Sequence, residues 1–104
     1  MRVEVRSSGR VFDSELTPRV ERRLGFELDR FDRQVSHVEA HLKDVNGPKG
    51  GDDLVIKLIA HVRGLPEIIV EETADDVGAV IDKAAHRLGY TIARKLQKRR
   101  VSRN

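Results

Sequence analysis

The chain has 104 residues and a net charge of +3, with 20 Lys and Arg against 17 Asp and Glu and no cysteine. A chain of this length folds as one domain with a modest core. The absence of cysteine excludes disulfides, thiolate metal sites and cysteine nucleophiles. Residues 1–20 are too charged for a signal peptide, and no later run approaches membrane-spanning length. We therefore expect a soluble, cytoplasmic protein.

The N-terminal third of the chain predicts a strand followed by a helix. Val3 and Val5 alternate with charged side chains over residues 1–8, which is the pattern of a half-buried strand. Asp13 or Ser14 can then cap an amphipathic helix, since both side chains accept hydrogen bonds from the first helical N–H groups. The apolar stripe of that helix comprises Leu16, Val20, Leu24, Leu28 and Phe31.

Three further strands are expected in the middle of the chain. Residues 38–42 alternate apolar and polar side chains, and residues 54–62 form a more apolar run. The Asn-Gly-Pro-Lys-Gly-Gly loop at 46–51 links them as a hairpin, and a turn at 64–66 leads into a fourth strand at 67–72.

The last predicted element is a long amphipathic helix. Thr73 with Asp76 three residues later is a capping-box pattern for its start. After residue 96 no apolar face continues, so we expect a single domain at 1–96 and a basic, frayed tail at 97–104. The apolar positions of the helix are Val77, Val80, Ile81, Ala84, Leu88, Ile92 and Leu96.

The predicted order of elements is β-α-β-β-β-α, an α+β fold. Because hairpins link the later strands, we expect a four-stranded, mainly antiparallel sheet with both helices packed on one face. Double-stranded-RNA-binding domains share this topology, and a shared topology indicates a fold rather than a function.

Positive charge is concentrated at the C-terminal end of the chain. Every acidic residue lies at or before Asp82, whereas residues 83–104 carry only basic charges. Such a segment favours a polyanion, because neutralising phosphates releases their counterions. Nucleic acid is therefore the first partner to expect, with an anionic membrane surface as the competitor. The basic residues are Lys83, Arg87, Arg94, Lys95, Lys98, Arg99, Arg100 and Arg103.

Helical periodicity also gathers basic residues into one stripe on each helix, away from the apolar positions. If the helices lie side by side, the stripes would line one cationic groove suited to phosphates. The alternative for the first helix is a solvated face, because its Glu and Asp residues lie three or four positions from its arginines. The stripes comprise Arg19, Arg22, Arg23, Arg30 and Arg33 on the first helix, and Lys83, Arg87, Arg94 and Lys98 on the second.

Each basic stripe contains an aromatic residue, Phe26 on the first helix and Tyr90 on the second. We expect these rings to pack between the helices, with stacking on RNA bases as the alternative.

Three histidines and a glutamate form a second polar cluster. His37, Glu39 and His41 share one side of a predicted strand, and His61 has the matching parity on the next, so a metal site can be drawn. Alternating polar residues on an open sheet face give the same pattern without a metal, and this is the interpretation we favour.

No motif in the chain indicates an enzyme. The loop at 46–51 lacks the terminal Lys-Ser/Thr of a P-loop and leads into a strand, which disfavours ATP binding. Lys49 is then either part of a flexible hairpin tip or a contact to RNA phosphate. No serine or carboxylate set has the arrangement of a catalytic site, so we expect neither catalysis nor a cofactor.

Two segments carry a resemblance to a known family. The first is residues 74–82 (Ala-Asp-Asp-Val-Gly-Ala-Val-Ile-Asp) with the following Arg87-Leu88 and Arg94. The second is the hairpin at 38–52 with its Asn-Gly-Pro-Lys-Gly-Gly loop. They resemble the ribosome hibernation promoting factors and ribosome-associated inhibitors, over nearly the whole chain to about residue 98. The chain departs from that pattern at Gly78, where an aromatic residue is usual.

The resemblance implies a short-form hibernation factor that binds rRNA in the mRNA and tRNA channel of the small ribosomal subunit under stress. It implies no enzyme activity. We expect no membrane partner and no small-molecule substrate, and we favour a monomer, although the sequence leaves the oligomeric state open. The basic positions of the family correspond to Arg87 and Arg94. The expected RNA-binding residues are Arg19, Arg22, Arg23, Arg30, Lys49, Lys83, Arg87, Tyr90, Arg94, Lys95, Lys98, Arg99 and Arg100.

Two functions of other classes remain open. A general double-stranded-RNA binder would bind free duplex as tightly as ribosomes. A protein-interaction module would use the exposed sheet face near Val55 and Ile59 and would show little salt dependence.

Overall fold

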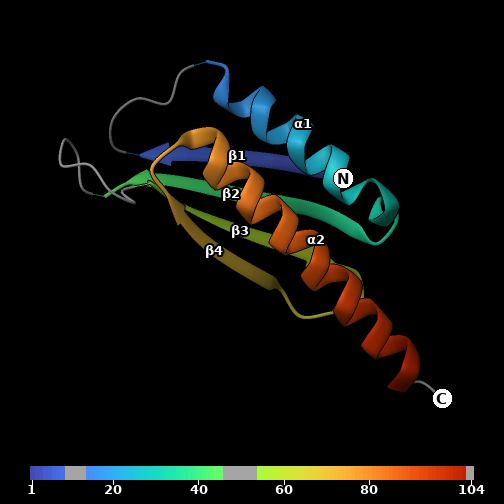
Figure 1. Cartoon of the computed structure of the whole chain (residues 1–104). Helices are drawn as coiled ribbons and strands as arrows, with labels where there is room; N and C mark the ends of the chain where they lie inside the picture. The colour runs from blue at the N-terminus through green and yellow to red at the C-terminus, as the bar shows by residue number, and fades with distance from the viewer. Residues whose placement is uncertain (9–13, 46–53, 103–104) are drawn as a thin grey trace.

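A four-stranded sheet covered on one face by two helices makes up the structure, a computed structural model that describes residues 1–8, 14–45 and 54–102 (Figure 1). The predicted α+β fold and its order of elements are confirmed. The elements are β1 (Arg2–Ser8), α1 (Leu16–Leu28), the short 3-10 helix η1 (Asp29–Phe31), β2 (Val35–Asp44), β3 (Leu54–Val62), β4 (Ile68–Ala74) and α2 (Val77–Ser102).

The strands lie in the sheet in chain order, β1-β2-β3-β4. β1 pairs with β2 in parallel, with Val3 opposite Val38, because α1 carries the chain back across the sheet between them. The β2–β3 and β3–β4 pairs are antiparallel, with Ala40 opposite Leu58 and Leu58 opposite Val70. The sheet is therefore mainly antiparallel, as predicted.

The core lies between the sheet and the helices. α2 packs over β3 and β4, and α1 packs beside α2 and over β1. The predicted apolar stripes of both helices are buried, apart from the half-buried Val77 at the start of α2. Each buried Leu or Ile contributes roughly 1.5–3 kcal/mol of transfer free energy, so these stripes fix both helices on the sheet. The largest fully buried side chains include Leu24, Leu28, Leu42, Ile56, Leu58, Leu88 and Ile92.

Both helices begin later than the sequence predicts. Glu15 is the N-cap residue of α1 and its side chain makes no capping hydrogen bond, so the expected Ser14 cap is wrong. Asp13, the other expected cap, lies outside the described residues. At α2, Asp76 is the capping residue, since its Oδ2 accepts a 2.8 Å hydrogen bond from the N–H of Ala79. The capping box expected from Thr73 does not form, because Thr73 belongs to β4.

α2 continues past its last buried residue. The helix extends to Ser102, through most of the segment expected to be a basic, frayed tail, and its last turns project beyond the sheet (Figure 1). Leu96 is the last buried side chain that the structure describes on α2. The continuation has a local cause, because Gln, Lys and Arg are good helix formers, and the Arg99 guanidinium donates a 2.7 Å hydrogen bond to the Arg63 carbonyl. Neither α1 nor α2 is long and apolar enough to span a bilayer.

The turn between β3 and β4 gives a first test of this packing. Gly64 has φ +79°, and a Cβ there would collide with the Arg99 guanidinium. We expect Gly64→Ala to lower the free energy of unfolding by about 1–2 kcal/mol, because alanine is strained at positive φ.

The matched control is Gly25→Ala in α1, where an added Cβ meets no heavy atom within 4 Å. This change should leave stability unchanged or raise it by up to about 1 kcal/mol, since alanine favours a helix. Urea denaturation followed by circular dichroism measures both. Equal effects of the two substitutions on stability would contradict the requirement for glycine at position 64 of the turn.

Candidate nucleic-acid interface

A hollow of about 300 Å³ lies between α1 and the first turns of α2. The α1 side supplies three cations, whereas the α2 side supplies Gly78 and Asp82. A Cβ on Gly78 would lie 2.8 Å from Nη2 of Arg19, so this glycine leaves room for the Arg19 guanidinium. The cations are Arg19, Arg22 and Arg23.

Arg23 bridges the two helices. It donates hydrogen bonds of 2.8 Å to Glu27 on its own helix and 3.0 Å to Asp82 on α2. Desolvation acts against the charged guanidinium, but the bonds to both carboxylates outweigh it and raise the pKa of Arg23. The alternative interpretation of α1, in which its arginines pair with nearby acids, thus holds for Arg23, whose positive charge is compensated by two carboxylates. No acidic partner contacts Arg19 or Arg22 within the part of the chain that the structure describes.

The basic stripe of α2 lies on the opposite side of that helix, over β4. Lys83 Nζ donates a 2.8 Å hydrogen bond to the Thr73 carbonyl, and Arg87 donates one of 2.7 Å to Glu72. Glu72 also lies 3.7 Å from Lys83. The expected single groove lined by both stripes is therefore wrong, because the α2 stripe faces the sheet edge and not α1.

The basic stripe expected on the first helix also ends early. The chain leaves α1 through η1, so Arg30 sits on a 3-10 turn and Arg33 on the turn that follows. Arg30 lies over the Phe31 ring at 4.6 Å and borders a second hollow with Arg100 of α2. Positive charge thus lines both ends of the space between the helices, with the Arg23–Glu27 pair between them.

The projecting end of α2 holds four exposed cations without an acidic partner among the residues described, and we call them the distal cations. Three of them share one side of the helix, and Arg100 lies on another side. Two of them border a hollow beside the β3–β4 turn, and Arg100 faces η1. The distal cations are Arg94, Lys95, Lys98 and Arg100.

Phe26 and Tyr90 are exposed, and the expectation that they pack between the helices is wrong. Their exposed fractions are 82% and 63%. The helices approach too closely for a ring, since a Cβ on Gly89 would lie 2.9 Å from Cγ of Glu27. The Arg94 guanidinium lies 5.9 Å from the centre of the Tyr90 ring. A ring flanked by a cation is a suitable stacking surface for a base.

Some of the predicted RNA-binding residues lie elsewhere. Arg99 is engaged with the carbonyl of Arg63 and is half-buried. Lys49 and its hairpin loop fall outside the described residues, so their role stays a prediction.

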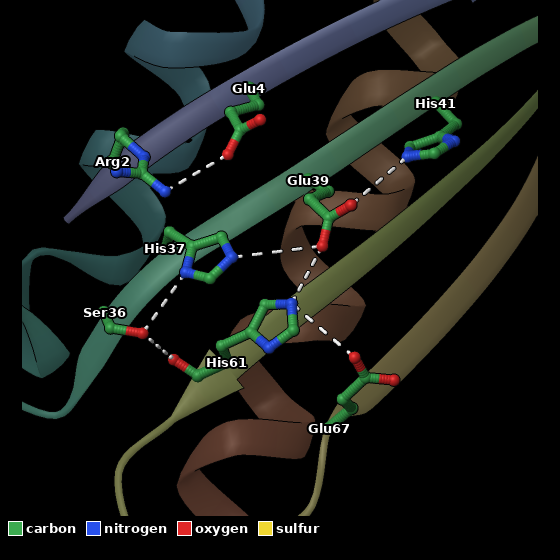
Figure 2. A network of polar contacts seen from close by, with 8 residues as sticks. All are labelled: Arg2, Glu4, Ser36, His37, Glu39, His41, His61 and Glu67. Atoms are coloured by element: carbon green, nitrogen blue, oxygen red, sulfur yellow. Dashed lines mark hydrogen bonds and ion pairs between the residues drawn. The ribbon is translucent and has the colours of Figure 1, made fainter.

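The open face of the sheet presents the histidine cluster and an apolar patch. His37, Glu39, His41 and His61 gather there (Figure 2). The hydrogen bond from His61 lowers the pKa of Glu39 from its ordinary value against the opposing effect of desolvation, and the charges of the three histidines lower it further. Ile69, 53% exposed and opposite Ile59, enlarges the patch expected near Val55.

The paired and the distal cations should differ in what their removal does to stability. Arg87→Ala should lower the free energy of unfolding by about 0.5–1 kcal/mol, because it breaks a partly exposed pair with Glu72. Lys98→Ala should change it by less than about 0.5 kcal/mol. Urea denaturation at low and high salt measures both, and a Lys98 effect as large as that of Arg87 would contradict this division.

Comparisons with known proteins identify the fold. No protein-family model matches the chain, and no curated protein matches it. The N-terminal domain of Thermus thermophilus Protein Y is similar with a TM-score of 0.73 at 22% identity, over 90% of this chain and 98% of that one. A ribosomal subunit interface protein from Coxiella burnetii is similar with a TM-score of 0.74 at 16% identity, over 93% and 99%. The chain therefore has the fold of these two proteins, which agrees with the fold that its sequence resemblance implies.

Proposed function

We propose that this protein is a hibernation factor, which binds rRNA in the mRNA and tRNA channel of the small ribosomal subunit and inhibits translation under stress. The observation that carries the proposal is the group of distal cations on the projecting end of α2. The fold supports it, since one similar protein is described as a ribosomal subunit interface protein. The family resemblance of the sequence supports the small subunit as the partner.

The binding surface in this proposal is the solvent side of the two helices. The projecting end of α2 enters a groove of folded RNA, where the distal cations neutralise phosphates. Arg19 and Arg22 add contacts from α1, and the exposed rings of Phe26 and Tyr90 stack on unpaired bases. A protein held this way in the channel excludes mRNA and tRNA by occupying their space, which requires no catalysis and no cofactor.

The residues already paired within the protein have a different role in the proposal. Lys83 and Arg87 hold α2 against β4 through Glu72, so a phosphate must compete with that carboxylate for them. Their contribution to RNA affinity is consequently smaller than that of the distal cations, although Arg87 occupies a basic position of the family. Arg23 is restricted in the same way by Glu27 and Asp82.

Charge reversal on the projecting helix tests the binding surface. The double variant Arg94→Glu and Lys98→Glu should lower the affinity for small ribosomal subunits by about tenfold or more, because two phosphate contacts become repulsive. Co-sedimentation with purified subunits measures it.

The matched control, Lys43→Glu and Lys57→Glu, reverses the charge of two side chains that are exposed on the open face of the sheet. It changes the net charge equally and should leave binding nearly unchanged. If the control loses binding and the α2 variant retains it, the interface lies on the sheet and the proposal fails.

A competition experiment separates a ribosome factor from a general RNA binder. Free duplex RNA should displace the protein from small subunits only at a large excess, since a shaped channel offers more contacts than a regular helix. Equal affinities would instead favour the general binder.

The salt dependence of subunit binding gives a second readout. The neutral double variant Arg94→Gln and Lys98→Gln should reduce the slope of log K against log salt by about 2, one for each lost phosphate contact. An unchanged slope would show that these side chains do not contact phosphate, and salt-independent binding would favour a protein partner.

A further inference from the structure

The open face of the sheet brings three nitrogen and oxygen donors together from two strands. His37 and Glu39 are two residues apart on β2, so their side chains lie on the same face. His61 is directly opposite His37 on β3. All three side chains are half-buried, and they lie on the face of the sheet that the helices leave uncovered (Figure 2).

The distances among these donors are close to those of a metal site. One carboxylate oxygen of Glu39 lies 2.8 Å from Nε2 of His61 and 3.9 Å from Nε2 of His37. All three donor atoms lie within 4.8 Å of one another. Tetrahedral ligands at zinc bond lengths of 2.0–2.1 Å are about 3.3 Å apart. Small side-chain rotations that move each donor atom by a few tenths of an ångström to about one ångström therefore bring the three donors into place.

The two histidine rings determine how the site would close. Their centres are 4.0 Å apart and their planes differ by 13°, so they stack. The lone pair of an imidazole nitrogen lies in its ring plane, so the lone pairs of two stacked rings lie in nearly parallel planes. The rings must tilt toward each other to direct both nitrogens at one ion. The side chains of His37 and His61 are 26% and 28% exposed, so solvent on the open face leaves room for that tilt.

Further donors surround this set. His41 Nε2 is shielded from solvent, has no hydrogen-bond partner among the described residues, and lies 3.7 Å from the second oxygen of Glu39. Glu67 lies 3.7 Å from His61 on the other side. Either residue, or a water molecule, can complete a fourth position.

The sequence alone favours a metal-free sheet face, but the structure brings the three donor atoms within 4.8 Å of one another. We therefore propose that His37, Glu39 and His61 form a binding site for zinc or a similar divalent transition-metal ion. Two imidazoles and one carboxylate are a donor set that suits zinc, cobalt, nickel or copper, and not magnesium or calcium, which take oxygen ligands. The ion replaces the direct hydrogen bond between Glu39 and His61 and links β2 to β3 through its ligands. The site is on the face of the sheet opposite the helices, so it leaves the distal cations free for RNA.

Metal titration of the untagged full-length protein tests the proposal. Zinc binding, measured by competition with a chromophoric chelator, should be saturable with one ion per chain and an affinity in the micromolar range or tighter. Cobalt should give the visible absorption of a four-coordinate ion, which free cobalt lacks. Affinity should fall on acidification, because protons compete with the ion for the ligating nitrogens.

Two ligand variants and one control complete the experiment. His61→Gln and Glu39→Gln should each lower the zinc affinity by at least about tenfold. His86→Gln changes an exposed histidine of α2 outside the cluster and should have no effect. Circular dichroism establishes that each variant is folded. Zinc binding that is absent in the unaltered protein, or equal in His61→Gln and His86→Gln, would overturn the proposal.

Discussion

The burial of the α2 apolar stripe against β3 and β4 is the constraint on which the rest of the structure depends. It sets which side chains of the helix reach solvent and which reach the sheet edge. Lys83 and Arg87 meet Glu72 for this reason, and Gly78 and Gly89 leave space for side chains of α1 where the two helices meet. The cationic surface is thus a consequence of core packing. Along α2, the cations near the sheet are paired with an acid, whereas the distal cations are available to an anionic partner.

Periodicity was sufficient to predict the fold. Strands with period two and helices with period 3.6 bury the side chains that carry those patterns, so the order of elements and the apolar stripes followed directly from the sequence. Helix ends were less predictable. Thr73 has the chemistry of a capping residue, but pairing with Val55 across the sheet takes it into β4. The end of α2 depends on helix propensity where no apolar face remains.

The surroundings of the basic residues in the candidate site were predicted only in part, because helical stripes are one-dimensional patterns. They identify which residues share a face of one helix, but not which acids of another element that face meets. Asp82 and Glu72 neutralise cations from elements distant in the sequence, and no local spacing indicates those contacts. The exposure of Phe26 and Tyr90 was not predicted for a related reason, since the helices meet where Glu27 faces Gly89, two residues from different elements.

The helical continuation past Leu96 has a thermodynamic consequence for the free protein. Arg94 and Lys98 are four residues apart, and so are Lys95 and Arg99, a spacing at which like charges repel by roughly 0.2–0.5 kcal/mol per pair. A polyanion that screens these charges removes the repulsion. By linkage, a polyanion that binds these cations would stabilise the helical turns that carry them, and a more stable helix would in turn bind the polyanion more tightly.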